Sequence, residues 1–138
     1  MKTTRFGVSM DLELLEKLDL VVDKRGYPNR SEAIRDLVRA ELVEDEWSGS
    51  EGEVIGVLVI VFDHHQRELS SRLLHKEHNW GGDIMATLHI HLDHNNCLET
   101  KIIRGDREKV RKFSDELISM KGVKFGKLIP ATQGSNLS

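Results

Sequence analysis

The sequence predicts an α+β chain of two domains, in which a short β-α-α unit precedes a β-α-β-β-α-β unit. Three patterns support this: an alternating N-terminal segment, two helical stretches after it, and a Ser/Gly/Glu segment that separates them from four further strand-like runs. Alternation with a period of two is typical of half-buried strands, and apolar recurrence at three and four positions is typical of helices. The expected division of the chain is 1–47, a linker at 48–53, 54–131, and a flexible tail at 132–138.

The first unit opens with a strand at residues 4–10, where apolar side chains alternate with three others, Arg5, Gly7 and Ser9. A helix is expected from about Asp11 to Arg25, because leucines and valines recur at helical spacing and Gly26 can end it. A second helix is expected from Asn29 to about Trp47. Asn29 followed three residues later by a glutamate is a variant of the capping box.

A single strand has no ladder partner, and two short helices cannot close a core. A symmetric dimer solves both problems, because two strands pair into a ribbon and the helices interlock. This is the ribbon-helix-helix arrangement, whose ribbon enters the DNA major groove. The candidate DNA contacts are Arg5, Gly7 and Ser9 on the ribbon, with Asn29 and Arg30 at a helix start that can meet phosphate. A merely solvated strand face is the alternative interpretation.

The second unit predicts a ferredoxin-like split βαβ fold. The expected elements are a strand at about 53–62, a helix at 64–78, strands at 84–93 and 97–104, a helix at 106–120 and a strand at 123–130. The first strand is apolar at both odd and even positions. Because the domain's own helices can cover only one face of it, we expect the other face to meet another subunit.

Composition narrows the class of protein. One cysteine among 138 residues excludes an intrachain disulfide and fits a reducing compartment. A net charge of −3 excludes a chain-wide positive field for nucleic acid, so DNA binding must use a local surface. The longest apolar run, nine residues, is about half of what a membrane helix needs, and the N-terminus lacks a secretory signal. We therefore expect a cytoplasmic protein.

The segment TLHIHLDHNNCLE, residues 87–99, carries the metal chemistry. In a strand, His89 and His91 point to the same face, and their apolar neighbours are expected to pack against the helices on the opposite face. A three-residue hairpin loop would pair Asp93 with Cys97 and bring both histidines, Cys97 and Glu99 to one face. A two-residue loop would instead turn the thiol into the core, and the sequence permits either.

Two imidazoles and a thiolate suit Zn, Ni or Cu and do not suit Mg or Ca. Three ligands leave one position open, which His75, His78 or another subunit could fill. Glu99 could orient an imidazole. His64 and His65 are expected to begin the following helix and to stay outside the site. The alternative interpretation is a surface histidine pair beside a buried thiol.

Four motifs carry a resemblance to a known family: RFGVSMDLELLEKLD, RGYPNRSEAIRD, TLHIHLDHNNCLE and KGVKFGKL. Over residues 2–130 the chain resembles the nickel-responsive transcriptional regulators of the NikR family. The resemblance implies a homotetramer, in which two ribbon-helix-helix dimers flank four ferredoxin-like (ACT-like) domains. It also implies one Ni(II) per subunit at a subunit interface, bound in a square plane by His89, His91 and Cys97 of one subunit and His78 of another. Cu(II) should compete for such a site.

The resemblance further implies that the nickel-bound protein binds a palindromic DNA operator and represses nickel-uptake genes. Gly7 stands where family members often carry Thr or Ser, and Gln66 stands where some carry a DNA-contacting lysine. A second cation site for potassium near the DNA maps to Glu32 and Asp36, whose alternative is a solvated acidic pair. A small-molecule sensor with an amino-acid-binding ACT-like domain is the competing function. An enzyme is not expected, because a four-ligand planar site leaves no room for a reactive water.

Overall fold

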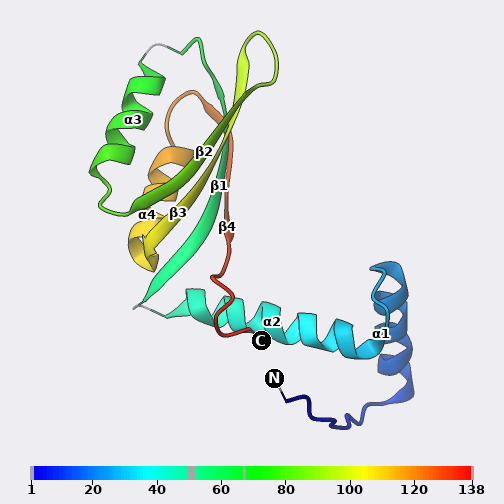
Figure 1. The fold of residues 1–138 in the computed structure, drawn as a ribbon. Coiled ribbons are helices and arrows are strands. Elements are labelled where there is room, and N and C mark those ends of the chain that lie inside the picture. The colour runs from blue at the N-terminus through cyan, green and yellow to red at the C-terminus, as the bar shows by residue number, and fades with distance from the viewer. Residues whose placement is uncertain (1, 50–51, 67, 138) are drawn as a thin grey trace. The chain divides into compact units, whose positions relative to one another are not determined.

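The computed structural model describes residues 2–49, 52–66 and 68–137, so parts of the predicted linker (50–51) and tail (138) and Arg67 lie outside the described residues. The elements are α1 Leu12–Lys24, α2 Arg30–Ser48, β1 Glu53–Asp63, α3 Leu69–Asn79, β2 Asp83–His91, β3 Asn96–Asp106, α4 Arg107–Ile118 and β4 Val123–Pro130 (Figure 1). The chain divides into two compact units, residues 1–41 and 42–138. This division falls inside α2, whereas the sequence suggested a boundary at its end. None of the described helices is long and apolar enough to cross a membrane.

Both helices of the first unit begin, and α1 also ends, where the expected capping residues lie. The Asp11 carboxylate accepts the backbone N–H of Leu14 at 2.9 Å and caps the start of α1. Gly26 follows the end of α1 with φ +74°, a left-handed conformation that glycine adopts without strain. The Asn29 side chain accepts the backbone N–H of Glu32 at 2.9 Å, at the start of α2. Both predicted helices are confirmed.

The predicted strand at residues 4–10 is not formed in the single chain. The described residues before α1 have no regular structure, and Phe6 and Val8 are 76% and 56% exposed. The physical reason is the absence of a ladder partner within one chain, since a lone strand leaves its backbone groups and its apolar face unpaired. The apolar side chains of this unit are therefore available to a second copy.

The second unit is a four-stranded antiparallel sheet in the order β2-β3-β1-β4, with α3 and α4 packed on one face (Figure 1). This is the predicted ferredoxin-like arrangement. The largest buried core side chains are Trp47, Leu58, Ile60, Phe62, Leu69, Ile103, Phe113 and Leu117. Trp47 belongs to α2, and its indole N–H donates to the carbonyl of Ala131 at 2.9 Å. The end of α2 therefore packs in this unit.

The two faces of the sheet differ in cover. Along β1, residues alternate between buried and half-buried, and the buried ones lie on the helix-covered face. The other face, which we call the open sheet face, carries the apolar side chains Val57, Val59, Val61, Leu88, Ile90, Leu98, Ile102, Phe125 and Ile129. No element of the second unit's described residues covers them, in agreement with the doubly apolar pattern of β1.

The helix that was predicted at 64–78 begins later, at Leu69. The Asp63 carboxylate accepts the backbone N–H of His65 at 2.9 Å, which holds residues 63–65 in a turn. Glu68 has φ +67°, a conformation that no α-helix interior allows. The expectation that His64 and His65 begin this helix is wrong, and His64 is instead held near the end of β1.

Candidate metal centre

The hairpin between β2 and β3 aligns the predicted ligands. His91 lies opposite Cys97, and His89 lies opposite Glu99. The prediction of a three-residue loop with Asp93 opposite Cys97 is wrong, because β2 ends at His91 and β3 begins at Asn96, so residues 92–95 form the connection. The observed pairing differs from the predicted one by two residues, and strand side chains repeat with a period of two. All four side chains therefore still share one face.

That face is the helix-covered one, contrary to the prediction. Leu88 and Ile90 were expected to pack against the helices, yet they are 59% and 43% exposed on the open sheet face. The reason lies in β3, where Cys97 pairs with Phe62 and is fully buried. The histidines must follow the face of the residues they oppose, although β2 is an edge strand and leaves their rings partly in solvent.

Asp93 holds the connection in shape. Its carboxylate accepts the backbone N–H groups of Asn95 and Asn96, each at 2.8 Å, and the side-chain amide of Asn96 at 3.0 Å. These hydrogen bonds lower the pKa of Asp93 to about 2, with the Asn96 side chain as the largest cause. An ionised Asp93 thus fixes the turn that brings His91 and Cys97 together.

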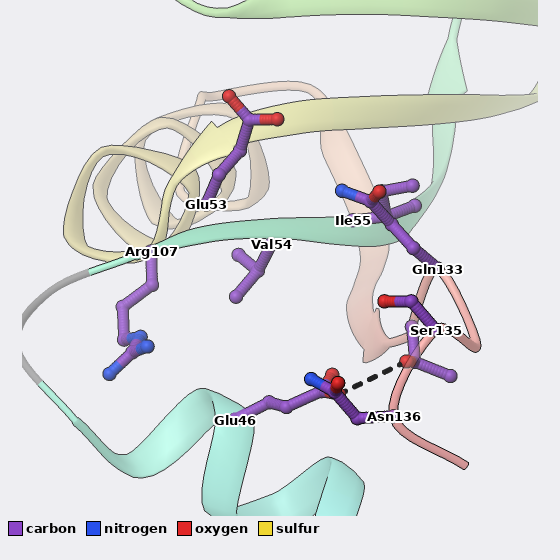
Figure 2. A pocket seen from close by; sticks show the side chains of 9 residues that line it. Glu46, Glu53, Val54, Ile55, Arg107, Gln133, Ser135 and Asn136 are labelled. Carbon is purple, nitrogen blue, oxygen red and sulfur yellow. Dashed lines mark hydrogen bonds between the residues drawn. The ribbon is translucent and has the colours of Figure 1, made fainter. Parts of the chain in front are cut away.

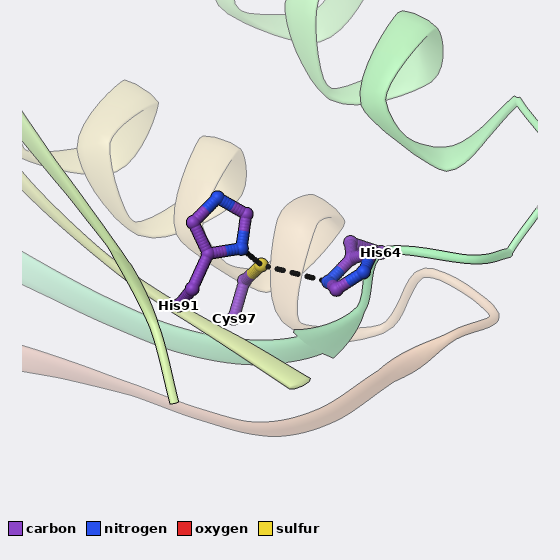
Figure 3. Close-up of side chains that lie close together, drawn as sticks. All are labelled: His64, His91 and Cys97. Atoms are coloured by element: carbon purple, nitrogen blue, oxygen red, sulfur yellow. Dashed lines mark hydrogen bonds between the residues drawn. The ribbon is translucent and has the colours of Figure 1, made fainter. Parts of the chain in front are cut away.

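Three donors converge at the end of the hairpin (Figure 3). Nδ1 of His64 lies 3.1 Å from Sγ of Cys97, and Nδ1 of His91 lies 3.3 Å from the same sulfur. Their ligand atoms lie within 4.8 Å of one another, and no other such group of three is found in the described residues. Sequence reasoning set His64 aside, because its position depends on the turn at 63–65.

The protonation states favour metal binding by neutral imidazole. Burial, followed by the charges of neighbouring histidines, lowers the pKa of His64, so its ring is neutral at pH 7. Burial, followed by the carboxylate of Glu99, raises the pKa of the Cys97 thiol. A metal that binds Cys97 must therefore displace its proton.

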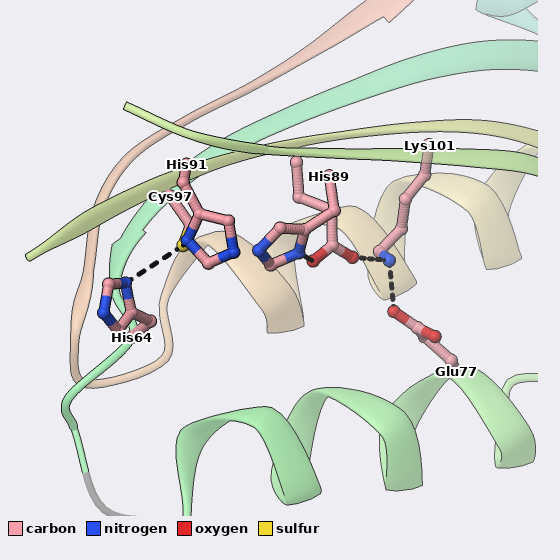
Figure 4. Close-up of polar contacts among 7 residues, drawn as sticks. His64, Glu77, His89, His91, Cys97 and Lys101 are labelled. Atoms are coloured by element: carbon pink, nitrogen blue, oxygen red, sulfur yellow. Dashed lines mark hydrogen bonds and ion pairs between the residues drawn. The ribbon is translucent and has the colours of Figure 1, made fainter. Parts of the chain in front are cut away.

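His89 lies beside His91, on the side away from His64, and contacts the carboxylate of Glu99 (Figure 4). The His89 and His91 ring centroids are 5.1 Å apart, and Nδ1 of His89 lies 3.2 Å from a carboxylate oxygen of Glu99. When Nδ1–H donates to Glu99, the lone pair of Nε2 is free for a metal. Histidines that bind metals usually donate their other ring N–H to a carboxylate or carbonyl in this way. The predicted orienting role of Glu99 thus has the required contact.

Sequence reasoning missed Lys101 and Glu77. The Lys101 side chain is 1% exposed and its ammonium forms ion pairs with Glu99 and with Glu77 of α3 (Figure 4). The sequence held a signal for Lys101, because Cys97, Glu99 and Lys101 are spaced by two residues along β3 and so point to the same face of the sheet. A lysine on the buried face requires acidic partners.

The remaining predicted ligand, His78, lies exposed on α3, directly after Glu77. No contact between His78 and the hairpin donors is found among the described residues of this chain. His75, the other candidate, accepts the Asn79 side-chain amide at its carbonyl, at 2.8 Å. Within one chain, His91, His89, Cys97 and His64 come together and His78 does not.

The predicted DNA contacts divide into two kinds. Arg5, Gly7 and Ser9 are all exposed. Arg30, in contrast, makes a two-point ion pair with Asp19, with distances of 2.7 and 2.9 Å, which raises the pKa of Arg30. Asn29 is occupied as the helix cap. These two residues therefore hold the first unit together through their side chains.

The predicted second cation site has protein partners for both carboxylates. Glu32 forms an ion pair with Arg35, and the Tyr27 hydroxyl donates to Asp36 at 2.6 Å. This hydrogen bond to an anion raises the pKa of Tyr27. A cation at Glu32 and Asp36 would have to displace or share these contacts.

A polar pocket lies elsewhere in the second unit, where the end of α2, the start of β1 and the C-terminal segment meet (Figure 2). It is lined by Glu46, Glu53, Val54, Ile55, Arg107, Thr132, Gln133, Ser135 and Asn136. Nε of the buried Arg107 has no hydrogen-bond partner among the described residues. None of the residues that line this pocket offers an imidazole or a thiol, so the pocket is not a site for the metals that prefer such donors.

Residues 55–131 match the family described as the NikR C terminal nickel binding domain, and residues 4–45 match the ribbon-helix-helix proteins of the CopG family. A putative nickel-responsive regulator of Geobacter metallireducens is 48% identical over 99% of this chain and 98% of its own length. Another from Nitratidesulfovibrio vulgaris is 50% identical over 99% of both chains. The chain belongs to the NikR family.

The fold of the NikR-family C-terminal domain also occurs in distant proteins. A solved structure of an uncharacterised protein from Thermotoga maritima superposes with a TM-score of 0.52, at 18% identity, over 59% of this chain and the whole of that one. At this identity the likeness shows only the fold. The donor set of this NikR chain, two or more imidazoles and a thiolate, fits the borderline metals that include nickel.

Proposed function

We propose that this NikR-family chain is a regulator and not an enzyme, and that Ni(II) controls its binding to DNA. The observation that carries the proposal is the alignment of His89, His91 and Cys97 on one face of a single hairpin, with Glu99 hydrogen-bonded to His89. A rigid hairpin fixes three donors of the type that nickel prefers.

The proposed ligands from one subunit are Nε2 of His89, one ring nitrogen of His91 and the sulfur of Cys97, and His78 of a neighbouring subunit supplies the fourth. When bound, nickel supplies a strong bond between two subunits. Each subunit then takes part in two sites, since its hairpin serves one and its α3 serves another. One Ni(II) per subunit at an interface follows from this division.

The open sheet face supports the proposed assembly. Exposed apolar patches of this kind usually mark interfaces in soluble proteins. We propose that the second unit forms the core of a homotetramer through this face, and that the first unit pairs with a second copy to form the ribbon that residues 4–10 cannot form alone.

The proposed DNA target is a palindromic operator, because a two-fold ribbon reads two equal half-sites. Arg5 and Ser9 would contact bases, Gly7 would allow close approach, and the Asn29–Arg30 helix start would meet phosphate through backbone N–H groups. The expected outcome in the cytoplasm is repression of nickel-uptake genes. A potassium ion between Glu32 and Asp36 would belong to the DNA-bound arrangement.

Nickel can control DNA binding only if it favours one arrangement of the DNA-binding units over another. An intersubunit bond at His78 has this property, because it exists only when the neighbouring subunits are correctly placed. Electrophoretic mobility shift with and without stoichiometric Ni(II) tests this coupling. Equal DNA affinity in the two conditions would reject it.

The metal assignment is tested by a visible-spectrum titration with Ni(II). A nickel–thiolate band is expected at one equivalent per subunit, lost in Cys97→Ala and retained in His94→Ala, a matched change at the exposed loop. Regulation of DNA binding that stays intact in Cys97→Ala would instead favour the amino-acid sensor.

A further inference from the structure

Lys101 is a fully buried ammonium group on the sheet. Its side chain is 1% exposed, on the same face of β3 as Cys97 and Glu99. A charge at such a place is retained only when opposite charges and hydrogen bonds replace its water. The carboxylates of Glu99 and Glu77 do this, and their side chains are only 11% and 17% exposed.

The two partners of Lys101 belong to different layers of the domain. Glu99 lies two residues before Lys101 on β3. Glu77 comes from α3, in the helix layer that packs on the sheet, and its carboxylate points toward the Lys101 ammonium (Figure 4). Glu77 follows the buried Leu69 and Leu73 at intervals of four, so the three share one side of the helix. Two leucines hold the first turns of α3 on the sheet, and the ion pair with Lys101 holds its last turn.

The two acidic partners of Lys101 each lie next to a proposed metal ligand. Glu99 accepts from His89 on one side of Lys101, and Glu77 on the other side directly precedes His78. We propose that Lys101 is a positioning residue, which ties the last turn of α3, and with it His78, to the sheet that carries His89. The functional part of this inference rests on the proposed role of His78 as a nickel ligand.

The ion pair between Lys101 and Glu77, which we call the tie, holds α3 on the sheet before any nickel binds. Leu69, Leu73 and the buried ion pair attach α3 through the chain's own side chains, so the metal bond adds to an attachment that already exists. The ion pair between Lys76 of α3 and Glu116 of α4 offers a contrast. Lys76 lies 3.5 Å from Glu116 with side chains 43% and 36% exposed, and pairs of this kind stabilise little.

Amide hydrogen exchange of the full-length protein in metal-free buffer, resolved by mass spectrometry, tests the tie. In Lys101→Met, which keeps the stem and removes the ammonium, Glu77 loses its buried cationic partner and Glu99 keeps only its contact with His89. We expect exchange in the last turn of α3 to rise about 100-fold while exchange in β1 stays unchanged. Glu77→Gln, which keeps a hydrogen-bond acceptor, should give about a 10-fold rise. The matched surface change Lys76→Met should leave α3 as in the wild type.

Unchanged exchange of α3 in Lys101→Met would overturn the proposal. Should that variant fail to fold, Glu77→Gln decides, and wild-type exchange there would equally overturn it. This measurement contains no metal, so its outcome is independent of whether the protein binds nickel.

A second readout separates positioning from simple packing. A ligand that binds only the attached helix shifts the equilibrium toward it. One equivalent of Ni(II) should therefore restore slow α3 exchange in Lys101→Met and fail to do so in Lys101→Met combined with His78→Ala. If Lys101→Met shows a normal nickel–thiolate band but its α3 exchange stays fast, the positioning role is refuted. Absence of the band in the wild type would refute the proposed function and leave the tie itself standing.

Discussion

Leu88→Glu on β2 is a direct test of assembly through the open sheet face. Leu88 is 59% exposed in the single chain and lies opposite Thr100, among the apolar side chains of that face. Burying a whole leucine contributes roughly 2 kcal/mol, so the exposed part represents about 1 kcal/mol per copy in an interface. The glutamate adds the cost of desolvating a carboxylate, about 3 kcal/mol per copy or more.

In a two-fold interface each change occurs twice. The total loss is then roughly 8 kcal/mol, which raises the dissociation constant by about a million-fold. Size-exclusion chromatography with light scattering should show the assembly reduced to smaller species at micromolar concentration. The fold should survive, because the new side chain is in solvent in the separated subunit, and circular dichroism checks this.

Lys112→Glu is the control. Lys112 is exposed on α4, in the helix layer and not on the open sheet face. Its replacement should leave the mass in solution unchanged. A wild-type mass for Leu88→Glu, or an equal effect of the two changes, would refute the reasoning.

Other predictions test single contacts. His64→Ala removes a group 3.1 Å from the Cys97 sulfur, so nickel affinity by competition titration should fall about 10-fold with the nickel–thiolate band shifted but present. Arg5→Ala should weaken operator binding in mobility-shift assays by about 1–3 kcal/mol, and full retention would exclude Arg5 as a base contact. The Arg30 guanidinium lowers the pKa of Asp19, so this ion pair stabilises the first unit above about pH 4 and ceases to do so as pH falls through the lowered pKa. Acid titration by circular dichroism should show a small helix loss there, absent in Asp19→Asn.

Much of the fold followed from local pattern. The caps at Asp11 and Asn29 form hydrogen bonds with backbone groups three residues on, so the residue types alone predict where α1 and α2 begin. The strands of the second unit followed from runs of apolar residues, and their order from the restricted connections of a β-α-β-β-α-β chain. The strand at 4–10 could not form in one chain, because its partner belongs to another copy.

The candidate site was only partly predictable. His64 reaches Cys97 because Asp63 turns the chain at the end of β1, and the apparent helical pattern of 64–78 concealed that turn. Lys101 looks like an ordinary strand lysine in the sequence. Its burial depends on α3, which supplies Glu77 from a distant part of the chain.

The sequence by itself determined that His89 and His91 share one face and that Cys97 and Glu99 share one face, and it left open whether the loop brings the two pairs together. The structure pairs His91 with Cys97 and so places all four on the same face. Strand side chains alternate strictly, so an even shift in register changes the loop and leaves the face unchanged. Only the tertiary structure decided which face that is. The helices cover the face that carries Cys97 and Phe62. This depends on packing between segments that lie far apart in the chain, and no local sequence pattern contains that information.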